Sequence, residues 1–134
     1  MELLRDIRNA YFRKPKADVK QVVVTDLSVE ELEAQLRQEA FFEEAEEYTY
    51  KYEGEILNLR RPAGVEDGYQ MVLHVRGFEH PDGVELLAHY EISRFNHPQE
   101  HLDGTIFRWD EGQLRMETVL QSYMIDYKRL SDPL

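Results

Sequence analysis

The sequence has no cysteine among its 134 residues. This absence excludes a disulfide framework, a thiolate nucleophile and a thiolate zinc site. The sequence also has no apolar run near the roughly 20 residues that a membrane-spanning helix needs, and its first residues show none of the features of a signal peptide. We therefore expect a soluble, cytoplasmic protein with no membrane partner.

The sequence also lacks several catalytic motifs. It contains no glycine-rich phosphate loop and no Gly-x-Ser-x-Gly nucleophile motif. It has only four serines, of which Ser28 is better explained as a helix cap. We therefore expect neither a serine triad nor a cofactor.

Basic residues are fewer than acidic ones. The chain has 16 Lys and Arg and 27 Asp and Glu, which gives a net charge of −11. A protein with this charge repels a polyanion, so nucleic acid is disfavoured as a partner. Residues 1–20 are nevertheless basic, whereas residues 30–55 hold ten glutamates and two bases. We interpret this acidic block first as a solvated surface. A docking surface for a basic partner, or a mimic of nucleic-acid phosphate, is the alternative.

Hydrophobic residues still make up 42% of the chain and aromatic residues 11%. This content suffices for one core, and no repeat or linker divides the chain, so we expect a single domain over 1–134. Helical spacing of apolar residues predicts helices over 2–12 and 28–40, the second capped by Ser28 and Glu31. The β-branched residues between these helices predict a strand over 18–25.

From Tyr48 onward the apolar period changes from 3.6 to 2, which is typical of strands. Tyr48, Tyr50 and Tyr52 are expected on a packed sheet face, with a ligand-stacking or partner-binding face as the alternative. A further strand is predicted over 55–59. Residues 60–68 show no periodicity and predict a loop, in which Arg60 and Arg61 are candidate binding residues for an anion.

The clearest hairpin joins 69–77 to 84–92 through the turn His80–Gly83. If Glu79 faces Val84, the core-type residues of both strands share one face, and His74 lies directly across from His89.

A second hairpin is predicted from strands 105–109 and 114–117, around a turn at Glu111–Gly112. A terminal helix is expected over 120–130, although 118–125 can equally extend the last strand. The pattern predicts an α+β fold with an antiparallel, largely meander sheet of about six to seven strands and two to three helices packed on one face.

The five histidines are the main concentration of catalytic-type side chains. His74 and His89, flanked by Glu91 and Arg76, are expected as a cross-strand pair on a half-exposed sheet, with proton transfer or ligand binding as the alternative. His97 and His101 fall in a segment that we interpret as a hydrogen-bonded loop, with a metal site as the alternative. Because thiolates are absent and the histidines are split between hairpin and loop, we expect no structural metal.

The stretch from Asp82-Gly83 through Arg94-Phe95-Asn96-His97-Pro98 to His101 resembles the TumE-type toxin family over about residues 82–104. The resemblance implies a small sheet protein from a toxin–antitoxin pair that acts on RNA or translation. It also implies that Arg94, His97 and His101 occupy the matching places of the family motif.

We expect the chain to be a non-enzymatic protein-binding or homo-oligomeric domain. Tyr48, Tyr50 and Tyr52, which we call the tyrosine stripe, are the candidate homodimer face. The alternative is a small toxin-like or histidine-dependent enzyme acting on RNA or nucleotides. The candidate catalytic residues for that alternative are His74, His89, Arg94, His97 and His101.

Overall fold

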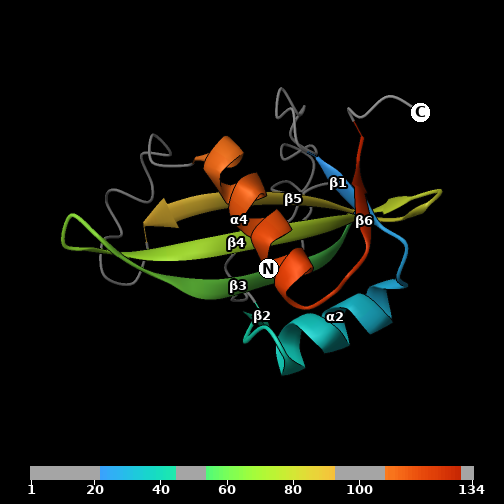
Figure 1. Ribbon diagram of the computed structural model, residues 1–134, viewed down its shortest axis with the longest axis horizontal. Helices are drawn as coiled ribbons and strands as arrows, with labels where there is room; N and C mark the ends of the chain where they lie inside the picture. The colour runs from blue at the N-terminus through green and yellow to red at the C-terminus, as the bar shows by residue number, and fades with distance from the viewer. Residues whose placement is uncertain (1–21, 45–53, 93–107, 131–134) are drawn as a thin grey trace, which may run out of the picture.

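The computed structural model describes residues 22–44, 54–92 and 108–130 (Figure 1). These ranges contain six strands and two helices in chain order. The elements are β1 (Val23–Thr25), α2 (Val29–Gln38), β2 (Glu43–Glu44), β3 (Glu55–Glu66), β4 (Tyr69–His80), β5 (Gly83–Ile92), α4 (Trp109–Ser122) and β6 (Tyr127–Arg129).

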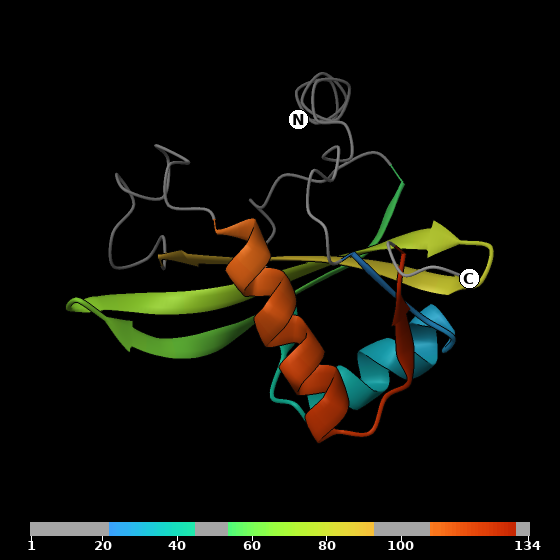
Figure 2. The ribbon, with the colours of Figure 1, turned by 45° about the horizontal axis from the view of Figure 1, so that its top comes forward.

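The six strands form one antiparallel sheet in the order β2-β3-β4-β5-β1-β6. Strands β2 to β5 follow one another as a meander, and β1 lies on the far side of β5 with β6 beyond it. Both helices lie on the same side of this sheet (Figure 2). The predicted α+β fold with a largely meander antiparallel sheet is confirmed.

The main core lies between the two helices and the sheet. Alternate strand residues point into it, and we call the side that bears Leu73, Val75, Leu86 and Ala88 the helix-covered face. The core also contains Leu32 and Leu36 of α2 and Met116 and Leu120 of α4. Burying each such side chain stabilises the fold by about 2 kcal/mol. The opposite side bears His74, Arg76, His89 and Glu91, and we call it the polar face.

The predicted hairpin of β4 and β5 is confirmed residue by residue. Leu73 pairs with Tyr90, and Glu79 pairs with Val84, as the apolar alternation requires. The pairing continues by one pair to His80 and Gly83, so the turn itself is shorter than predicted.

The helix predicted over 28–40 is also confirmed, as α2. Ser28 caps it, because the Glu31 amide donates to the Ser28 hydroxyl oxygen at 3.2 Å. The hydroxyl in turn donates to the Glu31 carboxylate at 2.9 Å, so the two side chains predicted to cap this helix do so.

The loop predicted over 60–68 is wrong, because β3 continues through this segment to Glu66. The reversal is a two-residue turn at Asp67 and Gly68, whose φ angles are 53° and 81°. Two positive φ angles are the mark of a type I′ hairpin turn, for which Asp-Gly is a preferred sequence. This local signal outweighs the missing periodicity.

Proline and glycine are accommodated within β3 at its outer edge. Strand β2 pairs with β3 at Leu59 and Arg60, so Pro62 lies beyond that pairing, where it has no ladder bond to donate. A register shift between Pro62 and Val65 absorbs one extra residue. These two features removed the alternation that would have revealed the strand.

The hairpin predicted over 105–109 and 114–117 is wrong, because Trp109–Ser122 forms helix α4. Gly112 is a helical residue that packs on β5, where an added Cβ would lie 2.4 Å from the His89 Cα. Its missing side chain therefore serves close helix–strand approach rather than a turn. Residues 105–107 lie outside the described ranges.

The chain end also differs from both predictions for it. Helix α4 ends at Ser122, and 127–129 form strand β6 instead of continuing a helix or extending a strand from 118. The strand predicted over 18–25 is described only from Val23 to Thr25. The helix predicted over 2–12 falls outside the part of the chain that the structure describes, and within that part no helix is long and apolar enough to cross a membrane.

Candidate functional site: a buried histidine–carboxylate cluster

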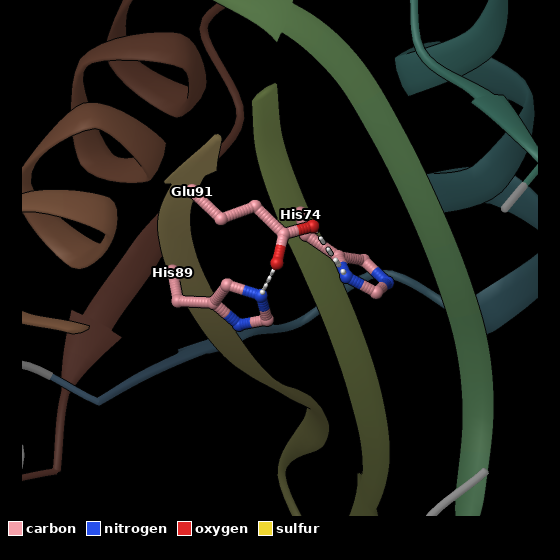
Figure 3. Close-up of side chains that lie close together, drawn as sticks. All are labelled: His74, His89 and Glu91. Atoms are coloured by element: carbon pink, nitrogen blue, oxygen red, sulfur yellow. Dashed lines mark hydrogen bonds and ion pairs between the residues drawn. The ribbon is translucent and has the colours of Figure 1, made fainter. Parts of the chain in front are cut away.

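His74, His89 and Glu91 come together on the polar face through the register of β4 and β5. His74 and His89 are direct cross-strand partners, and their ring centroids lie 5.0 Å apart at an interplanar angle of 64°. Glu91 follows His89 by two residues, so its side chain leaves β5 on the same side. Figure 3 shows its carboxylate between the two imidazole rings.

The Glu91 carboxylate contacts both rings. Its Oε2 lies 2.9 Å from His89 Nε2, and its Oε1 lies 3.5 Å from His74 Nδ1. A carboxylate only accepts hydrogen bonds, so His89 donates to it. The three residues are 6%, 4% and 6% exposed for His74, His89 and Glu91. The expected pair on a half-exposed sheet is therefore corrected to a buried cluster.

A second layer of polar groups holds the His74 ring from the β3 side. The far nitrogen of the ring, Nε2, contacts the Oδ1 of Asn58. The Asn58 Nδ2 donates to Glu55 Oε2 at 3.5 Å, and Glu55 is itself ion-paired with Arg76. The amide orientation of Asn58 is thus set by a carboxylate on one side and the imidazole on the other.

Burial governs the charge state of His74. Desolvation lowers the pKa of His74 from 6.5 to about 4, and the nearby charges of His89 and Arg76 act in the same direction. The hydrogen bond and charge of Glu91 raise this pKa but do not outweigh burial. His74 is therefore a neutral imidazole near pH 7.

The cluster has the chemical make-up of a ligand set. Each of the three side chains offers one ligand atom, and these atoms all lie within 4.8 Å of one another. Two imidazoles with one carboxylate can transfer protons or coordinate a metal ion.

The two arginines predicted as anion-binding residues, Arg60 and Arg61, are not part of the cluster and have partners of their own. Arg60 is the cross-strand neighbour of His74, and its guanidinium lies 3.1 Å from Glu43. The Arg61 guanidinium lies 6.0 Å from the centre of the Phe42 ring. Tyr48, Tyr50, Tyr52, Arg94, His97 and His101 all fall in segments that the structure leaves undescribed.

Sequence reasoning identified His74, His89 and Glu91 but missed Asn58 and Glu55. Their place depends on the register of β3 with β4, in which Asn58 faces Arg76 and Arg60 faces His74. The Asp67–Gly68 turn was the signal for this hairpin. Counting back from that turn alone places Arg61 opposite His74, and only the bulge near Pro62 shifts the register to Arg60.

A second feature is the way the two helices end. Phe41 and Met124 follow α2 and α4 with φ angles of 60° and 56°, and they are 73% and 89% exposed. Helix α4 closes in a Schellman motif, because Ile125 N donates to Leu120 O at 2.9 Å and Met124 N donates to Gln121 O at 3.2 Å.

Helix α2 ends in a wider turn, in which the Phe42 amide donates to Leu36 O, six residues back, at 3.1 Å. The residues that follow the two left-handed positions, Phe42 and Ile125, are buried in the core. Glycine is the usual residue at the position that Met124 occupies, and a left-handed conformation of a residue with a side chain costs about 1 kcal/mol. Both ends thus carry an exposed apolar side chain in a strained conformation.

The two helix ends lie at one corner of the molecule. Gln35 Nε2 of α2 donates to the carbonyl of Tyr123, the residue before Met124, at 3.2 Å. Figure 2 shows the C-terminal ends of both helices at this corner. Exposed Glu39, Glu43 and Glu44 follow the end of α2.

Comparison with protein-family models, curated proteins and solved structures finds no match for this chain. The similarity to TumE-type toxins therefore remains one of sequence pattern, and most of its motif lies in undescribed residues 93–104.

Proposed function

We propose that this chain is a protein-binding domain that docks a basic partner at the corner where its two helices end. We call this corner the helix-end surface and define it by Phe41, Met124, Glu39, Glu43 and Glu44. The observation that carries the proposal is the pair of exposed apolar residues at strained positions. Neither side chain adds to the core, and this supports a role for both in contact with another molecule.

The charges of the helix-end surface support a basic partner. Arg37 contacts Glu33 at 3.8 Å and Glu44 at 3.5 Å, which leaves the surface acidic in balance. A second copy meeting it across a two-fold axis would place like charges opposite one another. A partner with lysines or arginines around apolar side chains fits both the charge and the apolar pair.

This proposal selects the docking interpretation of the acidic block over the solvated one. Self-association through the tyrosine stripe stays a prediction, because those residues are undescribed. A second candidate function is histidine-dependent chemistry, which the cluster of His74, His89 and Glu91 favours. The burial of all three side chains supports a small ligand there rather than RNA or a nucleotide.

The experiment compares two synthetic amphipathic peptides, one of leucine and lysine and one of leucine and glutamate. We expect the basic peptide to bind the full chain and the acidic peptide to bind at least tenfold more weakly. Replacing Phe41 and Met124 together by glycine should weaken basic-peptide binding about tenfold, as measured by fluorescence anisotropy.

Val65→Thr is the matched control, because Val65 is equally exposed at the far tip of the β3–β4 hairpin. It should leave peptide binding unchanged. Equal effects of the control and the double variant, or no effect of either, would overturn the proposed surface. Sedimentation equilibrium of the unliganded chain tests whether a second copy binds this surface instead. A dimer that the double variant abolishes would show that the surface binds a second copy and not a basic partner.

A further inference from the structure

We propose that His74, His89 and Glu91 form a binding site for one divalent transition-metal ion, for which Zn²⁺ is the representative. This inference is independent of the proposed docking function, because it concerns the polar face of the sheet. The expectation of no structural metal rests on the absence of thiolates and on the split of the histidines between hairpin and loop. Two imidazoles and one carboxylate need no thiolate, since this ligand set is found in zinc sites that keep an open position.

The spacing of the ligand atoms supports the proposal. Bonds of about 2.05 Å to a tetrahedral ion place ligand atoms roughly 3.3 Å apart. The measured separations from Glu91 are 2.9 Å to His89 Nε2 and 3.5 Å to His74 Nδ1, which lie on either side of that value. All three ligand atoms of the set lie within 4.8 Å of one another.

The hydrogen bonds of Asn58 strengthen the argument by fixing which nitrogen of His74 is available. Asn58 turns its Nδ2 toward Glu55, so its Oδ1 faces His74 Nε2. An amide oxygen only accepts, so Nε2 carries the proton of this contact. Nδ1 is then the ring nitrogen that can offer a lone pair to an ion, and it faces the Glu91 carboxylate.

Two acceptors facing each other at 3.5 Å in a buried site repel unless a proton or a metal cation lies between them. A metal ion supplies that charge and takes both atoms as ligands. The contact from His74 to Asn58 is the kind of outer hydrogen bond that orients ligating histidines and fixes their tautomer. Asn58 is therefore a positioning residue for the site.

The ligand types also select the metal. Imidazole nitrogen favours zinc, iron, nickel and copper, whereas magnesium and calcium prefer oxygen alone. Three protein ligands leave at least one coordination position for water. We therefore expect Zn²⁺ and Co²⁺ to bind and Mg²⁺ not to compete.

The experiment titrates the chelator-treated full chain with Zn²⁺ by calorimetry and with Co²⁺ by visible absorption. We expect one ion per chain, with protons released on binding because the ligands must be unprotonated. Glu91→Gln, which keeps the shape of the side chain, should abolish binding or weaken it at least 100-fold. Asn58→Ala should weaken it about 10- to 100-fold.

His80→Gln is the matched control, because His80 lies at the turn of the same hairpin, away from the cluster. It should leave binding unchanged. Absence of binding to the wild-type chain, or binding that survives Glu91→Gln, would overturn the site. Loss of binding in a folded His80 variant would do so as well. Circular dichroism of each variant checks folding. If His74→Gln and His89→Gln do not fold, the loss of binding in Glu91→Gln still tests the site.

Discussion

The two faces of the sheet are both buried, but they are built from different chemistry. The helix-covered face is apolar and belongs to one large cluster that joins both helices. Among the described residues, the polar face buries two histidines, Arg76, Glu85 and Glu91 beside a small apolar cluster. Buried charged groups rarely add to stability over apolar residues of the same size. The difference supports the proposal that the polar face keeps these groups for their chemistry, whereas the helix-covered face holds the fold together.

Adjacent leucines of β5 provide the most direct test of this comparison. Leu86 belongs to the large cluster, whereas Leu87 lies on the opposite side with Val22 and Phe78. We expect Leu86→Ala to lower the free energy of unfolding by about 4 kcal/mol and Leu87→Ala by about 2 kcal/mol, measured by urea denaturation. Equal losses would contradict a division of roles between the faces.

Gly112→Ala should disrupt the close packing of α4 on β5, the strand that carries His89 and Glu91. The added Cβ would meet backbone atoms, 2.4 Å from His89 Cα and 2.6 Å from the Ala88 carbonyl oxygen. We expect a loss of about 3 kcal/mol in unfolding free energy, although alanine is the better helix former.

Leu114→Ala, an exposed change on the same helix, is the control for Gly112→Ala and should cost under about 0.5 kcal/mol. A Gly112 variant as stable as the wild type would show that α4 does not depend on close approach to β5.

Acid should act on the polar face through His74. Its pKa is 6.5 in the unfolded chain and about 4 in the folded one, so between these values the unfolded chain binds more protons. The free energy of unfolding of the metal-free protein should therefore fall as the pH drops from 6.5 to 4. The His74 contribution to that loss is about 3 kcal/mol, and below pH 4 it changes no further.

The contribution of His74 is isolated by comparison with His74→Gln, because carboxylates throughout this acidic chain also titrate in that range. Urea denaturation at several pH values should give a shallower slope for the variant. Parallel slopes for the two proteins would indicate that burial does not hold the folded His74 neutral.

The smallest expected effect is a gain in stability. Replacing Phe41 or Met124 by glycine removes a strained left-handed conformation and no core contact. Each change should raise the free energy of unfolding by up to about 1 kcal/mol, measured by thermal and urea denaturation. A loss of stability would show that these side chains support the fold, and would remove the argument for the helix-end surface.

Sequence patterns predicted the structure correctly where a local capping or turn signal was present or where one strand face was consistently apolar. The register of β4 and β5 followed from the alternation of Leu73 and Val75 with polar residues, and it placed His74 opposite His89. The α2 cap followed from Ser28 and Glu31 alone. The patterns failed at Gly112, where a glycine resembling a turn serves helix packing, and at 60–68, where a bulge hid a strand.

The sequence by itself thus determined the α+β class, the central hairpin and the cross-strand histidine pair, because a period-2 pattern with one apolar side allows a single register. Only the tertiary structure decided that these histidines are buried, and that Asn58 of β3 orients one of them. Burial depends on what packs against a face, and the Asn58 contact depends on a one-residue bulge. Neither property is encoded within the hairpin that carries the histidines.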